Sequence, residues 1–225
     1  MPREEPTHLT DLRLNMVDEI VHHAELAALY LGKRELDPRV IAAIGRVPRH
    51  EFVPDEVKQY AYFDTPLPIG WGKTISQPFI AAVMTDLLGI DPGDRVLEIG
   101  TGRGYHAAVF AELAAEVFTV EIVEELGVAA AETLTALGYR NIRTRIGDGA
   151  NGWAEFAPYD KMLLAASPER LPEKLIAQLK PGGRLVLPLG PEAAQELVLV
   201  TKPESGEPET RSIFPVRFAP LETSH

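Results

Sequence analysis

A glycine-rich segment near the middle of the chain limits most strongly what this sequence can fold into. Residues 98–104 read Glu-Ile-Gly-Thr-Gly-Arg-Gly, between the apolar, β-type run Arg95–Leu97 and the helix-like run His106–Leu113. A strand, a glycine turn and a helix in this order open a Rossmann-like nucleotide site. The third glycine of a dinucleotide fingerprint would fall at position 105, which is Tyr105. The spacing therefore disfavours NAD and suits S-adenosyl-L-methionine, whose amino-acid end and sulfonium must lie against bare backbone.

Strand-like and helix-like patterns alternate after this turn. We expect strands at 95–99, 117–121, 142–146, 161–165 and 184–188, and helices at 105–114, 124–137 and 171–179. This alternation predicts an α/β fold with a doubly wound, mostly parallel sheet covered on both faces. The last two expected strands, 197–201 and 213–218, are joined by a polar loop. They are therefore predicted to form an antiparallel hairpin at the sheet edge.

The chain before the glycine turn reads as helices followed by an irregular loop. A helix is predicted over about residues 9–36, with Gly32 able to end it, and a second helix begins at Asp37-Pro38. Residues 60–78 are rich in proline, glycine and aromatic residues. Such a segment is too irregular for a core helix and too apolar for a linker, which predicts a functional loop.

Composition narrows the class of protein. With 225 residues, we expect one compact domain, in which N-terminal helices and a substrate-binding loop (1–78) pack on a cofactor-binding core (79–225). The net charge of −11 argues against a nucleic-acid partner or an anionic membrane surface. The chain has no cysteine, and its six histidines form no ligand pattern; the adjacent His22 and His23 suit a helix surface, so no metal is expected. No secretory signal or membrane-spanning run is visible, so we expect a cytoplasmic protein. We also expect it to be a monomer.

Three acidic residues lie at the carboxyl ends of expected strands, where open α/β sheets bind ligands. Glu98 lies in the glycine turn, and Glu121 follows it by about the spacing at which an acid accepts hydrogen bonds from ribose hydroxyls. Asp148, between two glycines, is placed to approach an adenine amino group. The alternative is that all three are surface acids near strand ends.

Ser76 is the second candidate for chemistry. It lies just before a helix that begins at Pro78, so it is a plausible N-cap residue. The same position, a hydroxyl beside free N–H groups at a helix start, is also suited to bind a carboxylate. Composition alone does not choose between these interpretations.

Together these segments resemble the protein-L-isoaspartate O-methyltransferases, a family of Rossmann-like class I methyltransferases. The resemblance spans most of the chain from about Pro38 to Leu221 and is carried by Val47–Pro54, Ala61–Gly70, Thr74–Pro78, Val96–Gly102, Gly147–Gly149 with Gly152-Trp153, Leu179–Val186 and Val216–Leu221. The glycine turn alone would indicate only a class I methyltransferase. The Thr-Ile-Ser-Gln-Pro segment is far more specific to the family.

The resemblance implies an enzyme that transfers a methyl group from S-adenosyl-L-methionine to the α-carboxylate of L-isoaspartyl residues in damaged proteins or peptides, leading to repair through a succinimide. It implies that Ser76 is the catalytic residue, and that Ile69 and Ile75 bind substrate with it. The implied cofactor contacts are Glu98, Gly100, Thr101, Gly102, Glu121, Asp148 and Gly149. A carboxylate is already ionised at neutral pH, so this reaction needs neither a general base nor a metal.

Three positions depart from the family pattern. Arg103 stands in the glycine loop where a small residue is usual, and Lys73 and His106 also replace more common residues. For the positive charges of Arg103 and Lys73 three alternatives are open: they strengthen anion binding, they repel the sulfonium, or they point to solvent. These departures leave open a specialised carboxylate O-methyltransferase acting on a dedicated peptide or a small acid. A further alternative is a paralogue that binds the cofactor without turnover.

Overall fold

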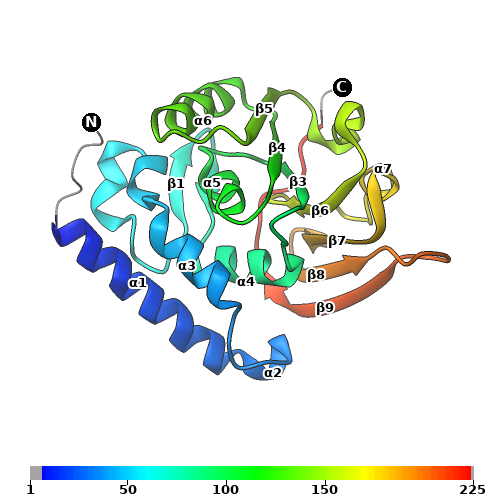
Figure 1. Ribbon diagram of the computed structural model, residues 1–225, viewed down its shortest axis with the longest axis horizontal. Helices are drawn as coiled ribbons and strands as arrows, with labels where there is room; N and C mark the ends of the chain where they lie inside the picture. Colours follow the sequence, from blue (N-terminus) through cyan, green and yellow to red (C-terminus); the bar gives the residue numbers. More distant parts are fainter. Residues whose placement is uncertain (1–6, 224–225) are drawn as a thin grey trace.

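The computed structural model describes residues 7–223, in which seven strands form one central sheet (Figure 1). In spatial order the strands are β5 (Ile142–Ile146), β4 (Glu116–Glu121), β3 (Arg95–Ile99), β6 (Tyr159–Leu164), β7 (Leu179–Leu189), β8 (Gln195–Thr201) and β9 (Glu209–Val216). The pairs from β5 to β7 are parallel, whereas β7–β8 and β8–β9 are antiparallel. The predicted mostly parallel sheet with an antiparallel C-terminal edge is confirmed.

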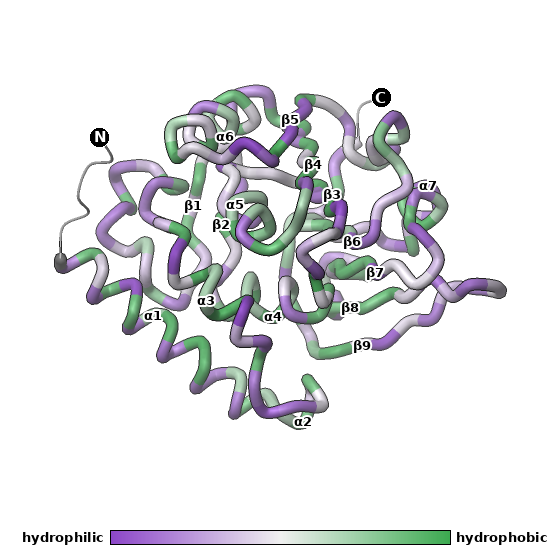
Figure 2. Tube along the Cα trace, in the orientation of Figure 1, coloured by the Kyte–Doolittle hydropathy of each residue, from purple (hydrophilic) through white to green (hydrophobic). Residues whose placement is uncertain are grey.

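Both faces of the sheet are buried. Alternate residues of the central strands point to opposite sides, so each strand contributes to two buried clusters. Val96 and Val117 belong to one buried cluster, and their neighbours Leu97 and Phe118 belong to a second. The flanking helices are α4 (Pro78–Leu88), α5 (Tyr105–Ala111), α6 (Glu124–Ala136) and α7 (Glu173–Ala177). The first three contribute to the first cluster, and α7 contributes to the second. Figure 2 shows the hydrophobic stretches along β7 and β8 that this double cover requires.

The N-terminal segment forms three helices outside the sheet, α1 (Thr7–Leu26), α2 (Ala28–Leu31) and α3 (Pro38–Arg46). The prediction of one helix over residues 9–36 is wrong, because the chain breaks after Leu26 and α2 ends at Gly32, whose φ is 74°. The predicted start of the next helix is confirmed, since the Asp37 side chain accepts a hydrogen bond from the N–H of Arg39. α1 contacts α3 and α4, which joins this segment to the core. No helix within residues 7–223 has the length and apolar character needed to cross a membrane.

A short hairpin lies where an irregular loop is predicted. Two 3₁₀ segments, η1 (Arg49–Phe52) and η2 (Asp55–Tyr60), lead into the antiparallel strands β1 (Leu67–Gly70) and β2 (Lys73–Ile75). Its turn contains Trp71 and Gly72, both with positive φ (51° and 69°). Such a turn suits a two-residue hairpin connection. The hairpin carries Ile69 and Ile75, both buried, towards the carboxyl end of the central strands.

Candidate active site

A cavity of about 700 Å³ opens at the carboxyl ends of β3 and β4. Its walls come from the β1–β2 hairpin, the start of α4, the glycine turn after β3 and the chain that follows β9. Nine of the ten predicted substrate and cofactor contacts line it: Ile69, Ile75, Ser76, Glu98, Gly100, Thr101, Gly102, Glu121 and Gly149. The structure thus brings the hairpin and the glycine turn, far apart in sequence, to one site.

The glycine turn presents backbone to the cavity. Gly100, Gly102 and Gly104 have φ values of 92°, 55° and 98°, a region that side chains disfavour. A Cβ at Gly100 would lie 3.3 Å from the Cβ of Ala165, and a Cβ at Gly102 would lie 3.1 Å from the Cδ1 of Ile69. Glycine is therefore required at these positions both by the positive φ and by the close approach of Ala165 and Ile69, and the turn lines the cavity with its main chain.

Glu98 is buried at the base of the cavity, with 1% of its surface exposed. Its Oε2 accepts a 2.6 Å hydrogen bond from the hydroxyl of Thr119, which also contacts the hydroxyl of Thr101 at 2.5 Å. Burial raises the pKa of Glu98 to about 8, and the charge of Glu121 acts in the same direction. In the ligand-free protein the raised pKa therefore favours the protonated form of Glu98 at neutral pH.

Glu121 lies at the end of β4 and fixes the glycine turn. Its two carboxylate oxygens accept hydrogen bonds from the backbone N–H of Gly102, at 2.7 Å, and of Val123, at 3.0 Å. Burial raises its pKa, while these backbone N–H groups oppose the rise. Each carboxylate oxygen has a second lone pair, so Glu121 can still accept hydrogen bonds from ribose hydroxyls.

Asp148 is the one predicted cofactor contact that does not line the cavity. Its Oδ1 accepts a 2.8 Å hydrogen bond from the N–H of Ala150 and so caps η3 (Gly149–Asn151). The neighbouring Gly149 reaches the cavity instead, packed so tightly that a Cβ there would lie 2.3 Å from the Cγ2 of Ile99.

Ser76 does not cap α4, so that interpretation is wrong. The N-cap residue is Gln77, which makes no capping hydrogen bond through its side chain. The N–H of Phe79 donates instead to Oδ1 of Asp64, at 2.7 Å, from the loop before β1. Asp64 performs the capping function from outside the helix, which leaves the Ser76 side chain at the cavity wall.

The three departures occupy different environments. Lys73 forms an ion pair with Glu222, which neutralises its charge and links the hairpin to the chain after β9. Arg103 lines the cavity, and its Nε is buried without a partner. His106 is buried with its ring stacked on Phe110, and burial lowers its pKa to about 4, so it is neutral.

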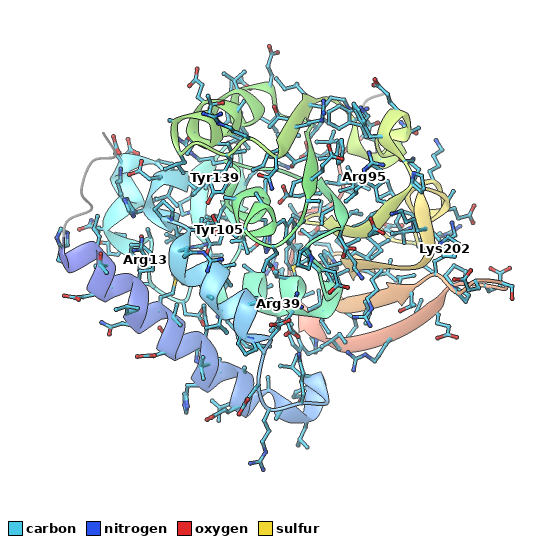
Figure 3. All side chains as sticks on the ribbon, in the orientation of Figure 1. Arg13, Arg39, Arg95, Tyr105, Tyr139 and Lys202 are labelled. Carbon is cyan, nitrogen blue, oxygen red and sulfur yellow. The ribbon has the colours of Figure 1, made fainter. Side chains whose placement is uncertain are left out.

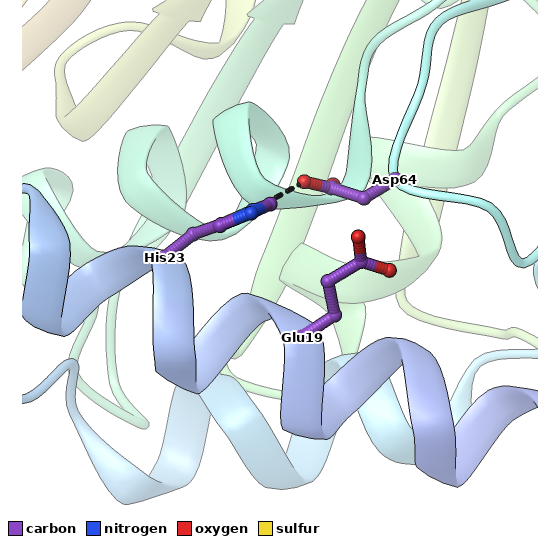
Figure 4. A group of neighbouring side chains, drawn as sticks. All are labelled: Glu19, His23 and Asp64. Carbon is purple, nitrogen blue, oxygen red and sulfur yellow. Dashed lines mark hydrogen bonds and ion pairs between the residues drawn. The ribbon is translucent and has the colours of Figure 1, made fainter.

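His23 is not a simple surface residue. Its Nδ1 lies 2.7 Å from Oδ2 of Asp64, and Glu19 completes the group (Figure 4). Among residues 7–223 this is the group whose ligand atoms could hold a metal ion, lying within 4.8 Å of one another. Asp64 already accepts hydrogen bonds from Gln77 and Phe79. The group therefore serves as a tether between α1 and the start of α4.

Two parts of the site carry no role in the sequence reasoning. The chain from Pro215 to Glu222 lines the cavity. Val216–Leu221, one of the segments that carry the family resemblance, was the signal in the sequence that could have indicated this. Arg49 is buried behind Ser76, and its backbone partners at Ala61 and Ser76 lie 12 and 27 residues away, so no local pattern points to it.

Comparisons with known proteins agree with one another. The model of a family described as Protein-L-isoaspartate(D-aspartate) O-methyltransferase matches residues 25–225. A Protein-L-isoaspartate O-methyltransferase 1 from Cupriavidus necator is 53% identical over 96% of this chain and 84% of its own length. One from Polaromonas sp. is also 53% identical, over 94% of this chain and 89% of its own.

Solved structures give the same result. A protein-L-isoaspartate O-methyltransferase superposes with a TM-score of 0.78 at 30% identity, covering 88% of this chain and 66% of that protein. A putative protein-L-isoaspartate O-methyltransferase from Plasmodium falciparum, solved with S-adenosyl-L-homocysteine, has a TM-score of 0.73 at 25% identity. That match covers 84% of this chain and 92% of that protein.

Proposed function

This chain belongs to the protein-L-isoaspartate(D-aspartate) O-methyltransferase family, and from that membership we propose that it methylates the α-carboxylate of L-isoaspartyl residues in proteins and peptides. S-adenosyl-L-methionine supplies the methyl group. The observation that carries the proposal is the convergence of Ser76, from the hairpin side, and the glycine turn, from the core, on one cavity.

The cavity fits the cofactor in shape and in charge. Gly100 and Gly102 line the cavity and would offer backbone groups to the amino-acid end, and the buried Glu98 would supply a partner for a cationic group. Glu121 would accept from the ribose hydroxyls through its unused lone pairs. Gly149, rather than the side chain of Asp148, would lie beside the adenine.

The acceptor requires little activation. An α-carboxylate is ionised at neutral pH and attacks without a general base, so the protein's task is alignment and exclusion of water. We propose that Ser76 holds the carboxylate, with Ile69 and Ile75 packing against the rest of the residue. A carboxylate oxygen forms a bond to the methyl carbon while the carbon–sulfur bond breaks.

The ester then leads to repair. The following backbone nitrogen attacks the ester carbonyl and displaces methanol, which closes a succinimide; hydrolysis of the ring returns part of the residue to aspartate. In this proposal the partners are isoaspartyl-containing proteins or peptides, and the enzyme acts as a monomer in the cytoplasm.

A peptide assay tests the proposal. The protein is incubated with methyl-labelled S-adenosyl-L-methionine and a matched pair of isoaspartyl and aspartyl peptides, and the labelled methanol released is measured. We expect release with the isoaspartyl peptide alone. Methyl transfer to neither peptide, despite cofactor binding, would contradict the proposal and favour a specialised substrate or a paralogue without turnover.

A further inference from the structure

Arg49 is the largest side chain that the structure buries completely. It lies in η1, and its Nε donates to the carbonyl of Ala61 at 2.9 Å while its Nη2 donates to the carbonyl of Ser76 at 2.6 Å. The guanidinium carbon lies 4.7 Å from the ring centre of Tyr105. Tyr105, which is labelled in Figure 3, is the first residue of α5. Arg49 therefore contacts both the segment that carries Ser76 and the helix that follows the glycine turn.

The charge of Arg49 has no counter-charge. Within residues 7–223 no carboxylate lies at ion-pair distance, and Nη1 is buried without any hydrogen-bond partner. Asp64 affects Arg49 electrostatically but is itself bound to His23, Gln77 and the N–H of Phe79. Burial lowers the pKa of Arg49, but a guanidinium remains protonated in proteins. A buried, unpaired cation is costly unless the function needs it.

The position of the Arg49 guanidinium relates its charge to one wall of the cavity. Ser76 and Tyr105, two of the residues that Arg49 contacts, both line the cavity, so the guanidinium lies directly behind that wall. The low polarity around Arg49 lets its field reach further than the field of an exposed cation. Lys73, in contrast, is paired with Glu222 at the rim.

We propose that Arg49 is a positioning residue for the acceptor: its hydrogen bond fixes the Ser76 segment, and its unpaired charge selects a carboxylate over a neutral group in front of that segment. This inference rests on the proposed function. Because Arg49 contacts neither the cavity's acids nor the glycines of the turn, its effect falls on the acceptor and not on the cofactor.

Binding measurements with a dead-end complex test this directly. In the presence of S-adenosyl-L-homocysteine, an isoaspartyl peptide and its α-carboxamide analogue are titrated into the wild type, Arg49→Met and Arg49→Lys. We expect the wild type to prefer the carboxylate peptide by about tenfold, a preference that Arg49→Met loses and Arg49→Lys partly keeps. Affinities for the carboxamide peptide and for S-adenosyl-L-homocysteine should change by less than about twofold.

Arg46→Met is the matched control, because Arg46 ends α3 and forms an exposed ion pair with Glu112. It removes the same charge away from the cavity, so the carboxylate preference should remain. Equal weakening of both peptides in Arg49→Met, or loss of cofactor-product affinity, would show a merely structural role and overturn the inference. An unchanged preference would overturn it as well.

The wild type alone gives a second measurement if Arg49→Met does not fold. A buried cation is screened little by salt, so the carboxylate preference should persist between about 0.05 and about 0.5 M salt. Loss of the preference at high salt would assign it to exposed cations and contradict the inference. If the wild type binds neither peptide, the proposed function fails with it; if it binds normally and Arg49→Met matches it, only this inference fails.

Discussion

At the scale of single residues, the wall of the cavity includes a position at which only glycine fits, because a Cβ atom would collide with a neighbouring side chain. Gly149 lies against Ile99 with no room for a Cβ, whereas Gly93, in the turn before β3, has nothing within 4 Å of the same position. Substitution of Gly149 therefore tests the packing against Ile99, and substitution of Gly93 measures the general effect on stability of replacing a glycine.

Gly149→Ala should destabilise the protein by about 1–3 kcal/mol, because the methyl group must displace Ile99 at the end of β3. It should also weaken S-adenosyl-L-homocysteine binding, since Gly149 lines the cavity. Urea unfolding and calorimetric titration measure both effects. Gly93→Ala is the control and should stay within about 0.5 kcal/mol of the wild type; a similar loss in both variants would refute the packing argument.

Ser76→Ala should lower kcat/KM for the isoaspartyl peptide by about ten- to a hundredfold, because a hydrogen bond to a charged acceptor is lost. S-adenosyl-L-homocysteine affinity should stay nearly unchanged, since the proposed function assigns Ser76 to the acceptor and not to the cofactor. Initial rates and calorimetry give the two numbers. The control is Ser212→Ala, which removes an exposed hydroxyl of β9 that donates a hydrogen bond to Glu196 on β8. A loss of cofactor-product binding in Ser76→Ala would mean that Ser76 contacts the cofactor instead.

At the scale of elements, the strands and helices of the core follow their sequence patterns closely. Strand β3 begins and ends at the predicted residues, and helix α4 begins at the predicted Pro78, since each has strong periodicity and glycine or proline at its boundary. The β1–β2 hairpin was not predicted, because Pro66 and Pro68 conceal the alternation of buried residues. The cap of α4 could not be predicted either, because Asp64 lies 15 residues before the N–H it accepts from.

The caps of two helices make a matched pair. Asp64→Ala and Asp37→Ala each remove a side chain that accepts from the first turn of a helix, α4 and α3 respectively, and each should cost about 1–2 kcal/mol. Only Asp64→Ala should also lower kcat/KM, by about three- to tenfold, since α4 starts directly after Ser76. Thermal unfolding and peptide kinetics measure the pair. Equal kinetic effects would show that Asp64 does not position the acceptor loop.

At the scale of the whole molecule, the cavity lies between the N-terminal segment and the core. Its buried ionisable groups have shifted pKa values, so the stability of the fold depends on pH. Burial raises the pKa of Glu98 from its ordinary value of 4.5 to about 8. His106 has a pKa of about 4, lowered by burial from 6.5. The raised pKa of Glu98 makes stability fall as pH rises through 8, and the lowered pKa of His106 makes it fall as pH drops from 6.5 towards 4.

These two slopes oppose each other between about pH 4.5 and 6.5, so the effect of Glu98 is clearest above that range. From pH 6.5 to 8 the folded chain holds a proton that the unfolded chain has released. The free energy of unfolding of the ligand-free wild type should therefore fall relative to Glu98→Gln by on the order of 1 kcal/mol per pH unit. Urea unfolding of both proteins at several pH values gives this difference directly, and contributions from groups that do not interact with Glu98 cancel in it. A difference that stays constant across this range would show that Glu98 is ionised in the folded protein, and that the cavity is charged before any cofactor binds.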